Sequence, residues 1–260
     1  MFAASLLLLA GLFAAAPVQD KKDDKPELDP KRIEAAVAEL EAAFKDGKSA
    51  DERVAAIKKN YEVTDARVAS AIEKGLKDKE LAVQTAAVDA LGRMPHPDAL
   101  AALHKFYKSE VKRLRDDDKL MPLVIQSVGR HGSESSIELL SDDLFMQRTF
   151  PAIKARVWSL GNIRSKKSVE ALFGMMNKAG TQKVNDYMQM FRVALWRLTG
   201  TDNGPDCQMW LAWWRDHEKD FEMSKEPPKF PEDVEKHWNE YWGIQPKKET
   251  PKEGGEKKDG

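Results

Sequence analysis

The 260-residue sequence predicts an all-α fold, a solenoid of about five stacked helix pairs. Apolar residues recur with the spacing of amphipathic helices, and almost no stretch alternates with the period of two that a strand requires. The segment from Arg156 to Met176, RVWSLGNIRSKKSVEALFGMM, shows the repeated unit: a helix end, a glycine, a short basic turn and a second amphipathic helix. One such pair cannot bury its apolar face alone, so the fold requires repeated neighbours.

The N-terminal segment is predicted to be a secretory signal peptide. Residues 1–16 are apolar or small except Ser5, and they end in Ala14-x-Ala16. The segment is short for a membrane helix, which needs about 20 apolar residues. No Lys or Arg precedes the apolar core, so an uncleaved N-terminal anchor or a misassigned start codon is the alternative. The signal peptide predicts an exported protein, periplasmic or envelope-associated in a bacterium, with no membrane span in the mature chain. Residues 17–28 are predicted to be a charged linker.

Composition limits the classes of partner. The single cysteine, Cys207, excludes an internal disulfide, so packing must stabilise the fold. The net charge is -1 while 33% of the residues are charged, which indicates a mixed surface without a general affinity for nucleic acid. We therefore expect a monomer whose partners are proteins.

Each predicted helix begins at a residue that can cap it. Asp29 precedes Pro30, and this helix runs to about Asp46. Later helices are predicted to begin at Ser49, Thr64, Asp78, Pro97 to Asp98, Asp118, Ser133, Thr149, Ser165 and near Asn185. Gly161 is predicted to end a helix at Leu160 by adopting the left-handed backbone. The charged run KRLRDDDK indicates an inserted loop before Lys119.

Three aligned columns define the repeat. The second helices align on an apolar position whose members are spaced 32 to 37 residues apart: Ile57, Leu91, Val128, Leu160 and Leu195. The preceding position is always small: Ala56, Ala90, Ser127, Ser159 and Ala194. The following position is glycine in the middle three units: Gly92, Gly129 and Gly161. Small residues are expected where neighbouring helices approach closely.

Segments such as LAVQTAAVDALGRMPHPDALAAL resemble HEAT repeats, in particular the short bacterial kind first named for phycobilin lyases. The resemblance extends from about Ser49 to Gly200, within a solenoid predicted over residues 29–223. It implies a right-handed superhelix whose second helices line the concave side, and it brings no catalytic residue. A tetratricopeptide array has a similar period, but its Trp, Leu-Gly and Tyr signature is missing here. The expected function is that of a scaffold for protein–protein interaction.

The C-terminal part is predicted to close the solenoid. From Ala194, ALWRLTGTDNGPDCQMWLAWWRDHEKDF resembles the closing segment of exported bacterial HEAT-repeat proteins. Trp210, Trp214, His217 and Phe221 fall on one helical face, which suits a helix that covers an open end.

A second aromatic helix is predicted after a Pro-rich linker, within residues 224–245. Its stripe is Val234, Trp238, Tyr241 and Trp242. We expect this helix to fold back as a cap on the helix of Trp210, Trp213 and Trp214; a free partner-binding anchor is the alternative. Residues 246–260 are predicted to be a disordered tail.

The sequence offers no catalytic, cofactor or metal motif. The five histidines are scattered and no HExxH pattern occurs. Cys207 with His217 is a poor zinc pair, and the turn from Asp202 to Asp206 lacks the terminal Glu of an EF-hand, so Asp206 is expected near a helix N-cap. Deoxyhypusine hydroxylase, a HEAT-built enzyme, uses repeated His-Glu pairs, and this chain has one, at His217. We therefore expect a protein that is not an enzyme. The alternative is a lyase-type HEAT protein that acts as an enzyme-associated subunit or binds a small ligand.

One polar pattern follows the columns. Two positions past the apolar column lie Lys59, Arg93, Arg130, Asn162 and Arg197, and Arg164 follows closely. Because a solenoid stacks equivalent positions, these residues predict a basic ridge, formed by Arg93, Arg130, Arg164 and Arg197, that binds an acidic protein partner. The alternative is that these cations complement helix dipoles, an effect of about 0.3–1 kcal/mol each.

Overall fold

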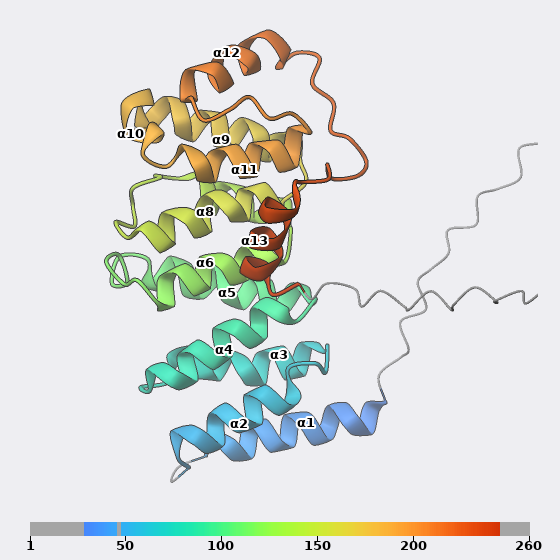
Figure 1. Ribbon diagram of the computed structural model, residues 1–260. Helices are drawn as coiled ribbons and strands as arrows, with labels where there is room; N and C mark the ends of the chain where they lie inside the picture. Colours follow the sequence, from blue (N-terminus) through green and yellow to red (C-terminus); the bar gives the residue numbers. More distant parts are fainter. Residues whose placement is uncertain (1–28, 46–47, 245–260) are drawn as a thin grey trace, which may run out of the picture.

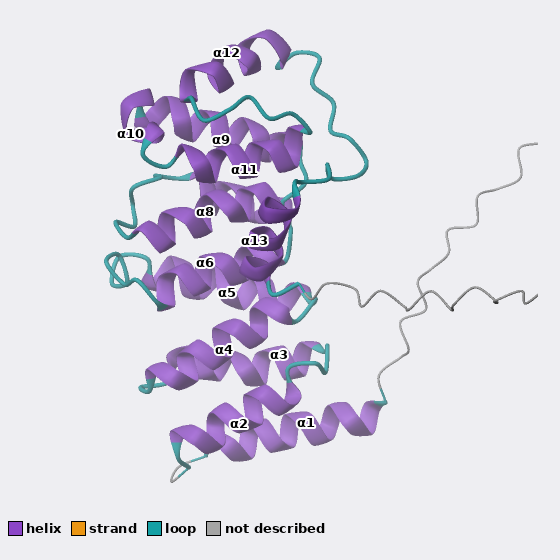
Figure 2. Cartoon of the chain, in the orientation of Figure 1, coloured by secondary structure: helices purple, strands orange, loops and turns teal. Residues whose placement is uncertain are grey.

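The computed structural model describes residues 29–45 and 48–244, and within these ranges the chain forms helices and loops without a β-strand (Figures 1 and 2). The predicted all-α class is therefore confirmed. The predicted signal peptide at 1–16, the linker at 17–28 and the tail at 246–260 lie outside the described residues. No helix in the described ranges combines the length and apolar character that a membrane crossing requires.

In the described part of the chain, five pairs of α-helices follow one another, and three further α-helices and two short 3-10 helices, Lys74–Lys77 and Glu134–Ser136, complete the fold (Figure 1). The first helices are α1 (Pro30–Ala43), α3 (Ala66–Glu73), α5 (Pro97–Glu110), α7 (Ile137–Ser141) and α9 (Lys166–Ala179). The second helices are α2 (Ala50–Asn60), α4 (Leu81–Arg93), α6 (Leu120–Arg130), α8 (Phe150–Asn162) and α11 (Met188–Thr199). The additional helices are α10 (Thr181–Asn185), α12 (Cys207–His217) and α13 (Glu232–Trp242).

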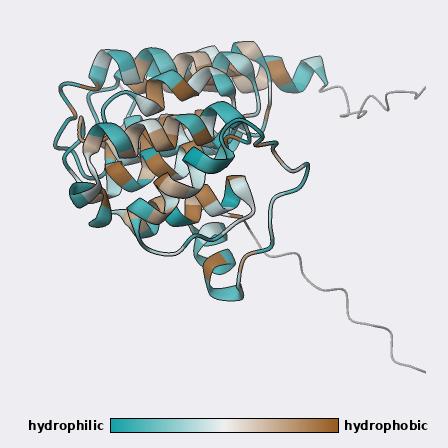
Figure 3. Ribbon diagram, turned by 90° about the horizontal axis from the view of Figure 1, so that it is seen from above, coloured by the Kyte–Doolittle hydropathy of each residue, from teal (hydrophilic) through white to brown (hydrophobic). Residues whose placement is uncertain are grey.

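The pairs stack in two layers. Second helices pack on second helices in the order α2, α4, α6, α8 and α11, and first helices α1, α3 and α5 form the opposite layer with α7 and α9. Polar and apolar residues alternate along the helices in Figure 3, as amphipathic helices of a two-layer stack require. The result is an α-solenoid.

Side-chain caps open most of the predicted helices. Ser49 forms a reciprocal capping box with Glu52, and Thr149 and Ser165 each accept a hydrogen bond from the first turn of their helix. The helix expected at Thr64 is capped one residue later, by Asp65. The last second helix begins at Met188 rather than near Asn185, because the short helix α10 comes first.

The apolar column forms the centre of the core. Ile57, Leu91, Val128, Leu160 and Leu195 are all fully buried. The repeat register derived from the sequence is therefore confirmed.

The glycine column has a different cause from the one predicted for Gly161. Gly161 lies inside α8 and its φ is not positive, so it does not end a helix in the left-handed conformation. Each column glycine instead faces the small residue of the next second helix: a Cβ would lie 2.8 Å from Cα of Ser127 at Gly92, 2.9 Å from Cα of Ser159 at Gly129, and 2.8 Å from Cα of Ala194 at Gly161. The small residue and the glycine are two halves of one contact, which lets successive helices meet backbone to backbone.

A buried arginine holds the shortest first helix. Arg156 is fully buried, and its guanidinium donates to the carbonyl oxygens of Leu139 and Leu140 at the end of α7, at 3.2 and 2.8 Å. It also donates to the Tyr107 hydroxyl at 2.6 Å and to the side-chain oxygen of Gln147. These neutral acceptors bind the two terminal nitrogens of the guanidinium, whereas its buried Nε has no hydrogen-bond partner, so they offset only part of the cost of burying the charge.

The Trp-rich helix α12 closes the first-helix layer, as predicted. It packs on α9 and α10, and Trp210 is fully buried while its Nε1 donates to the carbonyl oxygen of Gly204 at 2.8 Å. Trp214 stacks on Phe173 of α9 with a centroid distance of 4.9 Å and an angle of 9°. Rings therefore cover the end of the stack that a further repeat would otherwise bury.

Candidate functional site

The C-terminal helix α13 forms where the sequence predicts it. Pro231 precedes the helix, and Glu232, Asp233 and Glu235 place negative charge in its first turn, near the positive end of the helix dipole. Gly243 ends it with a positive φ of 69°, a left-handed conformation that glycine adopts at little cost.

The position of α13 differs from the predicted one. It does not cap the helix of Trp210, Trp213 and Trp214; it lies beside α6 and α8, and a long loop connects it to α12 (Figure 1). The prediction was wrong because it took the nearest apolar helix in sequence as the target. Trp210 and Trp214, two of the three rings expected to receive the tail helix, are already buried against the last repeat.

Ring contacts fix α13 to the face formed by the second helices. Trp238 is fully buried, and its ring lies 5.3 Å from that of Trp158 on α8. Tyr241 meets Trp158 edge to face at 4.8 Å, and Trp242 lies 5.7 Å from Trp238. Just before the helix, Phe230 meets Trp196 of α11 edge to face at 5.2 Å.

Polar contacts add little to this docking. The side chain of Gln126 on α6 donates to the backbone carbonyl oxygen of Tyr241, near the end of α13. Two cations lie over rings: the Lys154 ammonium is 4.1 Å from the Trp158 centroid, and the Arg197 guanidinium is 5.3 Å from that of Trp238. The charge of Arg130 on α6 also reaches α13, where it opposes the rise that burial causes in the pKa of the Tyr241 hydroxyl. We call the set Gln126, Arg130, Lys154, Trp158, Trp196 and Arg197 the helix-docking surface.

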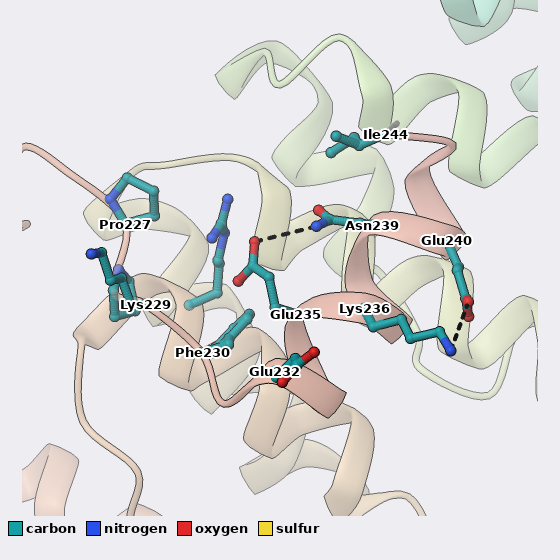
Figure 4. A pocket seen from close by; sticks show the side chains of 11 residues that line it. Pro227, Lys229, Phe230, Glu232, Glu235, Lys236, Asn239, Glu240 and Ile244 are labelled. Carbon is teal, nitrogen blue, oxygen red and sulfur yellow. Dashed lines mark hydrogen bonds and ion pairs between the residues drawn. The ribbon is translucent and has the colours of Figure 1, made fainter. Parts of the chain in front are cut away.

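A cavity of about 820 Å³ opens between α13, the loop before it and the end of α11 (Figure 4). Its lining mixes apolar and charged side chains: Arg197, Pro227, Pro228, Lys229, Phe230, Glu232, Glu235, Lys236, Asn239, Glu240 and Ile244. Glu235 accepts a hydrogen bond from Asn239, and Lys236 is ion-paired with Glu240, so part of this charge is used within α13 (Figure 4).

The predicted basic ridge is built into the repeats. Arg93 and Arg130 both bind Asp89, at 2.9 and 2.7 Å. Burial of Asp89 would raise the pKa of its carboxyl, but the hydrogen bonds from Arg93 and Arg130 outweigh burial and hold that pKa below its usual value. Arg130 lies on α6 and Asp89 on α4, so this ion pair joins two successive repeats.

The other two arginines of the ridge contact the C-terminal segment. Arg164 donates to the backbone carbonyl oxygens of Arg197, at 3.2 Å, and Ser224, at 2.6 Å. Arg197 lies over Trp238 and Phe230, and burial lowers the pKa of its guanidinium while Glu235 opposes that shift. These contacts hold α13 and its linker, so the structure gives each predicted ridge residue a place in the fold. Binding of an acidic partner by the ridge stays a prediction.

The shared carboxylate of Asp89 allows a matched test of the ridge. Arg130→Gln is expected to reduce the free energy of unfolding by about 1–3 kcal/mol, because the Arg130 side chain is 13% exposed and links two repeats. Arg93→Gln is expected to cost less than about 0.5 kcal/mol, because the Arg93 side chain is 41% exposed and its ion pair with the same carboxylate lies within one helix. Urea unfolding of the two variants compares them. Equal losses would show that Arg130 does not join the repeats.

The remaining sequence candidates have structural roles. Asp202 accepts two hydrogen bonds from Arg192, and Asp206 caps α12 by accepting from the Gln208 backbone at 2.7 Å, as expected for a helix N-cap. Cys207 is buried, and burial raises the pKa of its thiol to about 11. Within residues 29–45 and 48–244, no three His, Cys, Asp or Glu side chains are grouped so that they could hold a metal ion.

Sequence reasoning missed the residues that receive α13. Gln126 and Trp158 both occupy the position two residues before the apolar column, which faces away from the first helices. A tryptophan at this outward position of a second helix was the available signal, because a solvent-facing position rarely carries so large a ring without a partner.

Deletion tests the docking of α13. Removing residues 231–260 is expected to lower the thermal midpoint and to make Trp158 accessible to acrylamide, because Trp238 and Tyr241 of α13 cover its ring. Removing residues 246–260 alone leaves α13 in place and is the matched control, expected to change neither. If the longer deletion also melts like the full chain, α13 contributes nothing to the stability of the solenoid.

A family comparison supports the repeat assignment. A sequence model of the PBS lyase HEAT-like repeat matches residues 83–109, which comprise most of α4, the turn after it and most of α5. No curated protein matched the sequence. The matched segment contains Leu91 and Gly92 of the aligned columns.

Proposed function

Since the chain is a HEAT-repeat protein, we propose that it is an exported scaffold that binds a protein partner through the face formed by its second helices. The observation that carries this proposal is the docking of α13, an amphipathic helix that already lies on this face and buries Trp238 there. A face that holds one helix by ring contacts and one backbone hydrogen bond has the chemistry to hold another. The proposal includes no catalytic role.

Export is the part of this proposal that rests on sequence alone. The apolar residues 1–16 and the Ala14-x-Ala16 end support a cleaved signal peptide, and with it a periplasmic or envelope location. The intact mass of the protein purified from its host, measured by mass spectrometry, distinguishes a cleaved signal peptide from an uncleaved anchor.

The available part of the second-helix face suits a protein partner. Thr85, Asp89 and Arg93 follow one another at intervals of four residues on α4, so they share its outward side. Arg93 is exposed, whereas Arg130, Arg164 and Arg197 are half-buried. A single acid and a single base on this helical side favour a polar protein surface over nucleic acid, which needs a continuous basic patch.

Site-specific crosslinking in the host tests the scaffold function. A photo-crosslinking side chain at Thr85, on the second-helix face, is expected to capture a protein whose purified form then binds the chain. The same side chain at Ala101, an exposed residue of the first helix α5, is the matched control. Capture from Ala101 and not from Thr85 would contradict the proposal, because it would move the binding face to the other layer.

The cavity beside α13 supports a second candidate, the binding of a small ligand in a lyase-type HEAT protein. Its volume of about 820 Å³ falls within the range of small-molecule sites. Native mass spectrometry of the protein purified from its host decides between the two functions. A bound small molecule or a coloured preparation would favour this candidate, and the bare chain mass is expected for the scaffold.

A further inference from the structure

We propose that the helix-docking surface is the site for a helical segment of a protein partner, one with aromatic rings at the spacing of Trp238 and Tyr241 and with acidic side chains facing Lys154 and Arg197, and that this segment displaces α13. This inference rests on the proposed scaffold function and specifies its partner. Four features of the contact between α13 and the solenoid support it.

First, α13 shows which shape the surface accepts. Trp238 and Tyr241, three residues apart, both contact Trp158, at 5.3 and 4.8 Å. The hydrogen bond from Gln126 goes to a backbone carbonyl near the end of the helix, where carbonyl groups lack intrahelical donors. The surface therefore selects two ring positions and a helix end, and any helix that presents both can fit.

Second, α13 leaves two cations without a carboxylate. Lys154 and Arg197 lie over aromatic rings, and neither is within ion-pair distance of a described carboxylate. Burial lowers the pKa of Lys154, which is the cost of holding an ammonium there without a counter-charge. Glu235 of α13 attracts Arg197 but accepts its hydrogen bond from Asn239 instead. A partner with a carboxylate at these positions gains an interaction that α13 does not make.

Third, the contact buries polar atoms that have no hydrogen-bond partner. These are Nε1 of Trp158, Trp238 and Trp242, the Tyr241 hydroxyl and Nε of Arg130. Buried donors are nearly always paired in stable protein interiors. Five unpaired groups at this contact therefore make the docking of α13 weaker than the apolar surface that it buries would suggest. Trp158 and Arg130 belong to the surface itself, and acceptors on a partner would satisfy them.

Fourth, α13 can leave without disturbing a repeat. No helix lies between His217 and Glu232, so a loop connects α13 to α12. The helix has 11 residues, too few to be stable alone in water. Because α13 is tethered to the solenoid, its effective concentration at the helix-docking surface is high. It therefore excludes partner helices that bind this surface weakly, and a partner helix that binds more tightly displaces it.

Binding of a peptide in trans tests the inference on the full chain. The probe is a fluorescein-labelled peptide of residues 229–244. We expect it to bind the Trp238→Ala/Tyr241→Ala chain at least about tenfold more tightly than the wild-type chain, because the two substitutions empty the surface and remove the tethered competitor. Trp213→Ala, on α12, is the matched control and is expected to bind the peptide like the wild type. A peptide with serine at both ring positions is expected not to bind.

The same peptide-binding assay tests whether the surface prefers a helix with an acidic side chain facing Lys154. A peptide carrying His237→Glu places a carboxylate one turn before Tyr241, whose ring lies 5.2 Å from the Lys154 ammonium. It is expected to bind the emptied chain about threefold more tightly than the unaltered peptide, and a chain that also carries Lys154→Gln should lose this gain. The same affinity for both peptides would overturn the acidic part of the inference.

Two other outcomes overturn the displacement itself. One is an emptied chain that melts as a folded solenoid and yet binds the peptide no better than the wild type. The other is a wild-type dimer, dependent on concentration and abolished by the double substitution, which would identify the occupant as α13 of a second copy.

Hydrogen exchange tests the displacement on the wild-type chain, without any substitution. Excess peptide is expected to speed the exchange of the amides of α13. This assay uses purified chain and peptide, so its failure is distinct from a failure to crosslink a partner in the host.

Discussion

Replacing Gly129 by Ala is expected to reduce the free energy of unfolding by about 3 kcal/mol, the upper end of the usual cost of overpacking. The added Cβ would lie 2.9 Å from Cα of Ser159, and it would overlap the side chain of the same residue more closely still. A backbone atom cannot move aside as a flexible side chain can, so α6 and α8 must separate. Thermal and urea unfolding measure the loss.

Gly174 provides the matched control for Gly129. It also lies inside a helix, α9, but a Cβ there would meet nothing within 4 Å. Gly174→Ala is therefore expected to stabilise the protein by about 0.5–1 kcal/mol through its better helix propensity. If both variants were equally stable, successive second helices would not approach as closely as the structure shows.

Leu160→Ala is expected to destabilise the protein by about 2–5 kcal/mol, because Leu160 is fully buried in the apolar column and its truncation leaves a cavity between repeats. Leu81→Ala makes the same chemical change at a leucine that is 53% exposed, and it is expected to cost less than about 0.5 kcal/mol. A loss below about half a kcal/mol for Leu160→Ala would show that the repeat register is wrong.

The repeats could be predicted from the sequence because stacking imposes the same demand at the same position of each unit. The apolar residue and the small residue before it recur at equivalent places in five units, and the glycine after it recurs in three, so these weak signals support one another. The meaning of the glycine was missed. A left-handed helix end and a close approach of two helices both select glycine, and one sequence does not distinguish them.

The position of α13 could not be predicted, because it depends on a contact between residues far apart in the chain. The sequence shows that Trp238 and Tyr241 share a face and that the face must be covered. It does not show that Trp210 and Trp214 are buried by the last repeat, whereas the ring of Trp158 is covered by α13. Arg156 was missed for a similar reason: its acceptors lie on α7, α5 and a loop, and a charged residue within an apolar helix carries no sign of them.

Hydrogen exchange at the amides of residues 235–242 tests most directly whether α13 is a displaceable ligand of its own solenoid. Because α13 is short, tethered by a loop and held mainly by rings, it is expected to open separately from the repeats. Its amides should then exchange at least about tenfold faster than the most protected amides of α8, and protection in α8 should survive that opening. Equal protection in α13 and α8 would contradict the proposal, because α13 would then leave only when the whole solenoid unfolds.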